Sequence, residues 1–321
     1  MSKYEHIVTS EEAGMTINTI LRLNYKFSAR FRTKIKYQKL VDLNGTPTPG
    51  YIKPEVGDII GVRLPEEKSD FTPEDIPLDI IHEDNDLIII NKQPGIIVHP
   101  TKGHPEHTIA NAVMKYMLDS GQSYKIRFAN RIDMDTSGII IVCKNANAQN
   151  ELSSQMRKGR VLKKYTALVE GEVNIDYLKD SEGIDIISDD RFMIDIPIGR
   201  PDSVSIQRCF MPVEEGGKEA KSEVRILKHY TDSLSNAYTL LEVTLHTGRT
   251  HQIRVHLSHI GHPIAGDALY EGGSDIIKRQ ALHACFIEFN HPHSGNRISF
   301  EAALPEDIEK SINILKNQRR V

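Results

Sequence analysis

Residues 128–142, FANRIDMDTSGIIIV, join a polar run to a run of β-branched residues. Residues 139–142 (IIIV) predict a buried strand, because Ile and Val pack well on a pleated sheet. Thr136, Ser137 and Gly138 punctuate the chain just before it and predict a loop. That loop carries Asp133 and Asp135. Reactive side chains on a loop fixed by a buried strand are typical of an active site, so we expect one here.

The length and composition indicate a globular protein of about two domains. The chain has 321 residues, 39% hydrophobic and 26% charged, with a net charge of −4. Its three cysteines form no C-x-x-C pair, which favours a reducing compartment and gives no thiolate zinc site. The sequence shows no signal peptide and no apolar run long enough to cross a membrane. We therefore expect a cytoplasmic protein that has no membrane partner and is a monomer.

A strongly basic segment lies near the N-terminus. Residues 22–39 carry seven basic side chains and no acidic one, with aromatic residues interleaved. Cations can replace the counterions of an RNA backbone and rings can stack on bases, so we expect RNA binding. The alternative is a solvated charged face over core aromatics. The expected RNA contacts of this segment are Arg22, Arg30, Arg32, Lys34 and Lys36.

The order of elements in residues 1–65 resembles the S-four-type RNA-binding module, a small α/β unit. Residues 16–18 read Thr-Ile-Asn where that module has Arg-Leu-Asp. Residues 66–79, rich in Pro, Asp and Glu, predict an extended linker. Residues 80–321 are then the second domain. In it we expect Thr108 to cap one helix and Thr250 to cap another.

Asp133 admits three chemical interpretations. As a carboxylate ionised at neutral pH, it can act as a nucleophile or electrostatic stabiliser at a sugar carbon without an activating base. With Asp135 it also imitates the D-x-D-x-T loop of metal-dependent aspartate phosphatases, although there the apolar strand precedes the aspartates. The two carboxylates could instead be a glycosidase-like acid/base pair. For Asp135 alone we favour a role in bonding the amides of the turn.

Five histidines between His246 and His262 suggest a metal site. None forms H-E-x-x-H and no cysteine is close in sequence, so we expect hydrogen-bonding histidines and no metal. No P-loop motif accompanies Lys92, which argues against nucleotide triphosphate binding.

Five segments, in order, resemble the RluA-type pseudouridine synthase family. They are residues 83–100 (EDNDLIIINKQPGIIVHP), 131–138 (RIDMDTSG), 164–171 (KYTALVEG), 247–256 (TGRTHQIRVH) and 261–270 (GHPIAGDALY). The resemblance implies an α+β fold with a long, mixed but mostly antiparallel sheet and a central cleft. It implies isomerisation of uridine to pseudouridine in structured RNA, rRNA in preference to tRNA, without cofactor or metal.

The resemblance also implies roles for individual residues. Asp133 would be the catalytic aspartate, Arg254 its ion-pair partner, and Tyr165 the ring that packs on the target uracil. Arg131 would fill the gap left by the flipped nucleotide. Asn130, where the family usually has His, and Arg249 complete the expected RNA contacts. The loop from Gly199 to Lys221 is expected to clasp RNA and to be mobile without it. The alternative from another class is a ribosome-assembly factor that binds RNA without catalysis.

Overall fold

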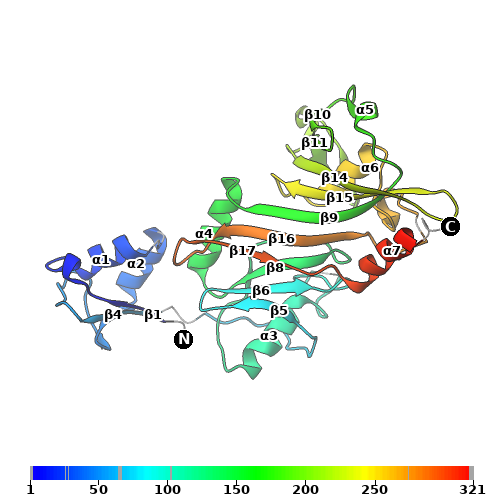
Figure 1. Cartoon of the computed structure of the whole chain (residues 1–321). Coiled ribbons are helices and arrows are strands. Elements are labelled where there is room, and N and C mark those ends of the chain that lie inside the picture. Colours follow the sequence, from blue (N-terminus) through cyan, green and yellow to red (C-terminus); the bar gives the residue numbers. More distant parts are fainter. Residues whose placement is uncertain are drawn as a thin grey trace.

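The computed structural model describes residues 3–25, 27, 29–63, 67–101, 103–273 and 275–317. They form a small N-terminal module and a larger body built on one long sheet (Figure 1). The strands of the module pair in the order β1-β4-β2-β3. Its elements are β1 (Lys3–Ile7), the 3-10 helix η1 (Ser10–Glu12), α1 (Ile17–Asn24), α2 (Ala29–Tyr37), β2 (Val41–Leu43), β3 (Thr46–Pro47) and β4 (Ile59–Arg63).

The aromatic residues of the basic segment belong to the module's core. Tyr25, Phe27 and Phe31 are each at most 6% exposed and pack with Ile20 and the rest of one hydrophobic cluster, whereas Tyr37 is exposed. The expectation that these rings stack on RNA bases is therefore wrong for the three buried ones, because the module needs them to fill its small core. The alternative, basic side chains around core aromatics, describes the segment.

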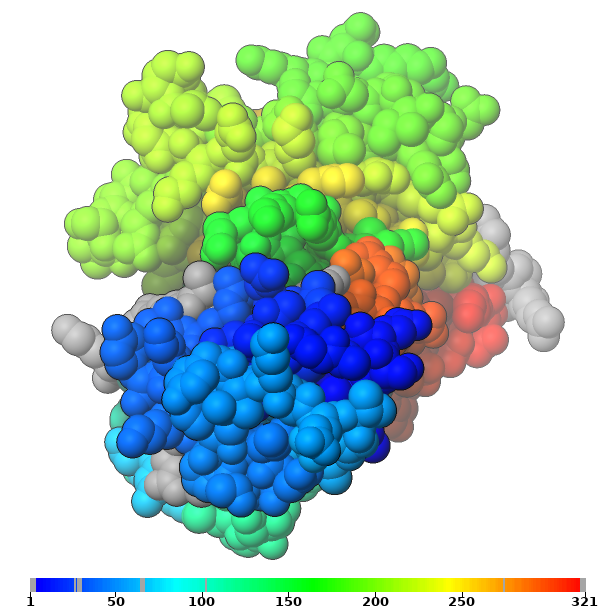
Figure 2. Space-filling view, turned by 90° about the vertical axis from the view of Figure 1, so that its left-hand side faces the viewer, coloured from blue at the N-terminus to red at the C-terminus, as the bar shows by residue number. Residues whose placement is uncertain are grey.

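The module contacts the body through a compact set of polar and aromatic side chains. Tyr4 of β1 donates its hydroxyl proton to Asp86, which also accepts a 2.7 Å hydrogen bond from Asn145. The Tyr4 ring stacks on His293 with centroids 4.5 Å apart. In Figure 2, the module (blue) stands at the front, with the green surface of the α4–β9 region directly above it. These contacts set the orientation of the module on the body.

The body is organised around a sheet of eleven strands within the described residues, in the order β10-β11-β14-β15-β9-β16-β8-β6-β5 with β17 on β16 and β7 on β8. Only β16 and β8 pair in parallel, so the expected mixed, mostly antiparallel sheet is confirmed. The strands are β5 (Asp79–Glu83), β6 (Leu87–Lys92), β7 (Arg127–Phe128), β8 (Ser137–Cys143), β9 (Leu162–Glu170), β10 (Ile184–Ser188), β11 (Arg191–Asp195), β14 (Lys221–Thr231), β15 (Ala237–Leu245), β16 (Leu282–Asn290) and β17 (Arg297–Glu301).

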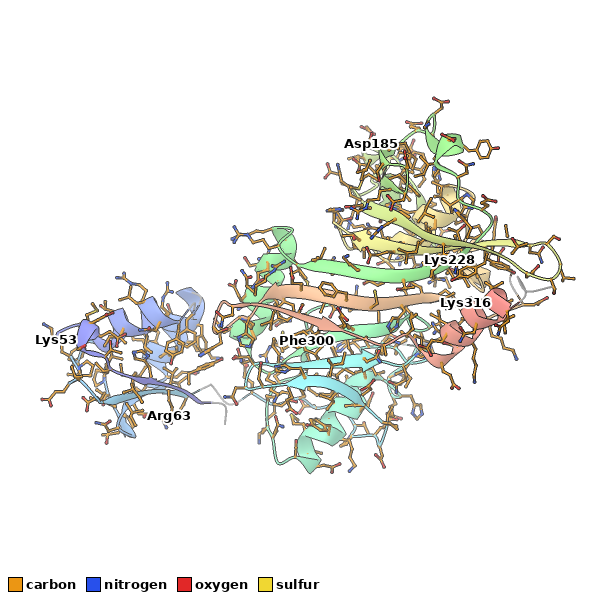
Figure 3. The ribbon with its side chains drawn as sticks, in the orientation of Figure 1. Lys53, Arg63, Asp185, Lys228, Phe300 and Lys316 are labelled. Carbon is orange, nitrogen blue, oxygen red and sulfur yellow. The ribbon has the colours of Figure 1, made fainter. Side chains whose placement is uncertain are left out.

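The helices and short elements fill in around this sheet. They are α3 (Ile109–Asp119), α4 (Ala146–Arg157), α5 (Ile175–Leu178), α6 (Gln252–His259), α7 (Glu306–Asn317), the 3-10 turns η2 (Val213–Glu215) and η3 (Ala268–Tyr270), and a separate pair of strands, β12 (Ile198–Gly199) and β13 (Cys209–Phe210). Figure 3 labels Asp185 on β10, at the top of the view, and Lys316 on α7, at its right-hand side. No helix of the described residues is long and apolar enough to cross a membrane.

Strand β8 is buried along its whole length because a helix covers each of its faces. Ile139 and Ile141 pack with α4 residues such as Leu152, while Ile140 and Val142 pack in the cluster formed with α3. A strand covered on both faces reads as a continuous apolar run rather than an alternating one. This confirms the buried strand expected at residues 139–142 and gives the preceding loop a rigid base.

Gly138 allows β8 to approach β16 closely. Its φ of +110° is unfavourable for other residues, and a Cβ there would lie 2.3 Å from the Ala284 carbonyl oxygen. Only glycine fits this position without moving one of the strands. The residue therefore fixes the point where the Asp133 loop enters the sheet.

The described part of the expected linker lies along the body. Phe71 and Leu78 pack in the α3 cluster, and Glu74 accepts a 2.8 Å hydrogen bond from the His107 amide. Glu67 accepts from both Lys34 of α2 and Arg127 of β7. The segment thus joins the module and the body by side-chain contacts as well as by the chain itself.

Candidate active site

Asp133 lies on the loop before β8 and meets Arg254 of α6, 121 residues later in the chain. Arg254 Nη1 donates a 3.0 Å hydrogen bond to Asp133 Oδ2. The other edge of the guanidinium is held by Asp267, through 2.7 Å bonds from Nε to Oδ2 and from Nη2 to Oδ1. The side chains of Asp267 and Arg254 are 1% and 7% exposed, and that of Asp133 is 26% exposed. One arginine thus links a buried anchor to a carboxylate that solvent can reach.

Electrostatics keep this arginine charged. Burial opposes the charge of Arg254, but the hydrogen bonds and the negative charge of Asp267, together with those of Asp133, raise its pKa. A permanently positive guanidinium favours the ionised form of a neighbouring carboxyl group. Asp133 Oδ2 is therefore held in a fixed orientation beside a positive charge.

Tyr165 lies on the face of β9 that turns toward α6. It is 8% exposed and packs in the cluster that contains Ile253 and Leu257 of that helix. Burial, and then the charges of Asp133 and the Cys285 thiol, raise its pKa. The ring is therefore a neutral phenol near Asp133, suited to stacking on a flat base. Asp133, Arg254 and Tyr165 are brought together from three distant segments.

Two basic side chains, which sequence reasoning missed, fix the Asp133 loop. Lys92 is fully buried, and its Nζ donates 2.8 Å hydrogen bonds to the carbonyls of Gln93, Ile96 and Met134. Arg279 Nη1 donates a 2.8 Å bond to the Asp135 carbonyl, and its other nitrogens bind Asp307 of α7. The consecutive carbonyls of Met134 and Asp135 thus accept hydrogen bonds from Lys92 and Arg279, which are far apart in the sequence. Lys92 lies in the family segment 83–100, but no pattern in the neighbouring sequence indicated that it would bind the Met134 carbonyl.

Asp135 does not act as expected in the turn. The Asp133 carbonyl closes the turn by accepting from the Thr136 amide at 3.2 Å. Within the described part of the chain, the Asp135 carboxylate makes no hydrogen bond to the turn amides. The expectation that it stabilises the turn this way is wrong, because the turn is held through main-chain carbonyls.

The remaining candidates near the loop divide into supporting and exposed side chains. Both polar atoms of the Asn130 side-chain amide bond the backbone of β8: the nitrogen donates to the Ile139 carbonyl at 3.0 Å, and the oxygen accepts from the Ile141 amide at 2.8 Å. Asn130 therefore supports the loop in this structure. Arg131 and Arg249 are both exposed, and Arg249 donates from Nε to the Glu219 carbonyl at 2.9 Å.

The basic candidates of the N-terminal module lie on its helices, apart from the sheet that carries Asp133. Arg22, Arg32 and Lys36 are exposed on α1 and α2, and Lys34 is half-buried against Glu67 at 3.3 Å. The side chain of Arg30 lies outside the described residues, as does Lys26. The structure therefore presents a basic surface that is separate from the Asp133 site.

Four of the five histidines around α6 are hydrogen-bonding groups, as expected, whereas His259 is exposed and packs near the Phe210 ring. His256 contacts Ser222 Oγ and the Ile196 carbonyl, each at 3.0 Å, and His262 contacts the Glu170 carbonyl at 3.0 Å. Thr250, however, does not cap α6. The helix begins at Gln252 after His251, which has a left-handed backbone, and the Gln252 side chain accepts from the Arg249 amide at 3.0 Å.

Among the described residues, one group has metal-like spacing, formed by Asp84, Asp86 and His291. It lies where the β5–β6 turn meets the β16–β17 turn. Asp84 already accepts from His82, His291 and the amides of Asp86 and Leu87. These bonds account for the cluster as a structural network.

Comparison with known proteins identifies the family. Residues 86–259 match the family model described as RNA pseudouridylate synthase. The chain is 40% identical over 283 residues to an uncharacterised RNA pseudouridine synthase of Bacillus subtilis, covering 86% of each. It is 37% identical to the ribosomal large subunit pseudouridine synthase D of Yersinia pestis, covering 81% of this chain and 78% of the relative. The human RNA pseudouridylate synthase domain containing 1 has a similar fold, with a TM-score of 0.56 at 22% identity over 76% of this chain and 96% of the other. The chain therefore belongs to the RNA pseudouridine synthase family, of the RluA type that its motifs resemble, and is an isomerase that acts on RNA.

Proposed function

We propose that this enzyme isomerises uridine in ribosomal RNA and that Asp133, Tyr165 and Arg254 carry out the reaction. The observation that supports the residue assignment best is the Asp133–Arg254–Asp267 chain, in which a buried arginine joins a buried and a partly open carboxylate. Relatives named large subunit pseudouridine synthase support the choice of rRNA. The exposed basic residues of α1 and α2 supply a surface suited to RNA phosphates.

The reaction breaks the N1–C1′ bond of uridine, turns the uracil and joins C5 to C1′. N1 gains a proton and C5 loses one, so no electrons enter or leave and the products balance. A carboxylate can take part directly at C1′, as a nucleophile or as a stabiliser of positive charge on the sugar. Asp133 has the charge, the solvent access and the fixed position for this role.

Arg254 and Tyr165 have complementary roles in this scheme. Arg254 holds Asp133 Oδ2, and the second carboxylate oxygen, Oδ1, is the atom we assign to the substrate. Tyr165 stays a neutral phenol because burial raises its pKa, so its ring can pack on the uracil without repelling it. The target nucleotide must leave the stack to reach them, and we assign to Arg131, which is exposed and two residues before Asp133 in the chain, the role of filling the gap.

The test compares two aspartates of one loop. Tritium release from transcripts that contain uridine labelled at C5 is measured for the wild type, Asp133→Asn and Asp135→Asn. We expect Asp133→Asn to fall to background and Asp135→Asn to keep most of its activity. Activity retained by a folded Asp133→Asn protein overturns the residue assignment. Running rRNA and tRNA transcripts in parallel tests the substrate, and modification of tRNA alone contradicts the choice of rRNA.

A further inference from the structure

His251 has an unusual backbone conformation beside the site. Its φ and ψ are 58° and 20°, in the left-handed region that non-glycine residues rarely adopt, at the start of α6. Its side chain is 14% exposed, and Nε2 lies 3.9 Å from Asp133 Oδ2. A strained residue persists only where its surroundings hold it, and such residues gather at functional sites. The neighbours of this imidazole therefore indicate its role.

A chain of hydrogen bonds sets the tautomer of His251. The Arg208 amide donates to the Tyr270 hydroxyl oxygen at 2.8 Å, and that hydroxyl lies 2.8 Å from His251 Nδ1. With one lone pair occupied by the amide, the Tyr270 hydroxyl directs its own proton to Nδ1. A neutral imidazole that accepts at Nδ1 carries its proton on Nε2. Nε2 is the ring nitrogen that lies 3.9 Å from Asp133 Oδ2, the oxygen to which Arg254 donates.

Tyr270 connects these hydrogen bonds to the segment between β12 and β13. Gln207 Nε2 donates to the Leu269 carbonyl at 2.7 Å, so adjacent residues, Gln207 and Arg208, dock on adjacent residues of η3. The Tyr270 ring also packs under the Arg254 guanidinium, 4.9 Å from its centroid, and edge-on to His251 at 5.6 Å. One tyrosine thus touches the loop, the arginine and the histidine.

We propose that His251 is a positioning residue for Asp133, and that Tyr270 transmits the docking of residues 207–208 to it. With these residues docked, the proton of His251 stays on Nε2, on the side of Asp133, and supports the orientation of that side chain. With them undocked, the Tyr270 hydroxyl can rotate and the tautomer is no longer fixed. This inference rests on the proposed role of Asp133 and adds how the neighbouring loop controls that carboxylate.

The charged groups around His251 agree with a neutral ring. Burial lowers the pKa of His251, with further lowering by Arg254 and Arg208, while Asp133 and Asp267 oppose this. Loss of the Tyr270 hydroxyl removes the hydrogen bond that stabilises the neutral form at Nδ1. The pKa of His251 then rises, and the resulting imidazolium competes with Arg254 for Asp133 Oδ2 at a higher pH than in the wild type.

The central test is Tyr270→Phe, which keeps the ring on Arg254 and removes only the hydroxyl. We expect kcat to fall roughly five- to tenfold, the scale of one neutral hydrogen bond, with an unchanged KM for RNA. The acidic limb of the pH profile of kcat should move to higher pH. In spectra of protein labelled with ¹⁵N-histidine, the wild type should show His251 with its proton on Nε2, and Tyr270→Phe should lose that preference.

A matched pair of histidine variants gives the control. His251→Asn should lower kcat, while His107→Asn should not, since His107 also has a positive φ of 56° but is exposed and lies before α3. Thermal unfolding of each variant separates folding from activity. If His251→Asn does not fold, Tyr270→Phe still decides.

The inference is overturned if Tyr270→Phe keeps the wild-type kcat and pH profile, or if wild-type His251 carries its proton on Nδ1. These outcomes are distinct from failure of the proposed function, in which Asp133→Asn itself stays active.

Discussion

Replacing Asp267 by Asn tests whether the buried arginine is held as the structure shows. Asp267 is 1% exposed and accepts two hydrogen bonds of 2.7 Å from Arg254. Breaking a buried ion pair by removing one charge costs roughly 3–5 kcal/mol, because the remaining charge is left without compensation. Asparagine keeps one carbonyl acceptor and Asp133 still neutralises part of the charge. We therefore expect a loss in the lower part of this range, about 3 kcal/mol of unfolding free energy.

The measurement is urea unfolding followed by circular dichroism, since the chain has no tryptophan. The loss should appear as a lower midpoint at an unchanged slope. Without urea, the folded variant should also have a lower kcat. Arg254 loses the Asp267 carboxylate that holds it, and therefore orients Asp133 less well.

The matched control is Asp190→Asn. Asp190 also pairs with an arginine, Arg225, at 3.0 Å, but both side chains are nearly half exposed, so its removal should leave stability and activity unchanged. If Asp267→Asn is as stable and active as this control, the reasoning about the buried pair is refuted.

Three further predictions follow from other parts of the fold. Gly138→Ala should destabilise the body and abolish activity, because the new Cβ meets the Ala284 backbone at 2.3 Å; wild-type thermal unfolding in this variant would contradict the close strand pairing. Arg32→Glu combined with Lys36→Glu should raise KM for RNA and flatten its dependence on salt while leaving kcat intact, and an unchanged salt slope would remove these residues from the RNA surface. Burial lowers the pKa of Lys92 from 10.5 to about 7, although the charges of Asp135 and Asp133 oppose this shift and that of Arg279 adds to it. Between pH 7 and pH 10.5 the unfolded chain therefore binds more protons than the folded protein does. The stability of the wild type relative to Lys92→Met should therefore increase as pH rises from about 7 to about 10.5, and parallel curves of unfolding free energy against pH would contradict it.

Local sequence patterns predicted the elements that depend on neighbouring residues alone, such as an uninterrupted apolar strand or a threonine cap. Residues 139–142 were recognisable as a buried strand because no polar residue interrupts them. Thr108 caps α3 as expected, accepting from the Asn111 amide. The start of α6 was not predictable in this way, because its first turn is organised by the Gln252 side chain rather than by Thr250.

The site was predictable only where motifs of a known family carry it. Periodicity brought neither Arg254 nor Tyr165 near Asp133; the family resemblance did, and the structure joins Asp133 to Arg254 at 3.0 Å. Asp267 and Arg279 were missed as partners because no local pattern marks a pair of residues 13 apart, as for Arg254 and Asp267, or 144 apart, as for Asp135 and Arg279. The buried rings of the N-terminal module were misread for a related reason, since an aromatic residue beside lysines looks the same in a core and on an RNA surface.

The most direct test of the central claim maps pseudouridine in ribosomal RNA of cells that lack this gene. We predict that at least one rRNA uridine stays unmodified in these cells. The wild-type gene should restore pseudouridine there, and Asp133→Asn, expressed at the same level, should not. An unchanged rRNA map in the deletion, or restoration by Asp133→Asn, would contradict the account.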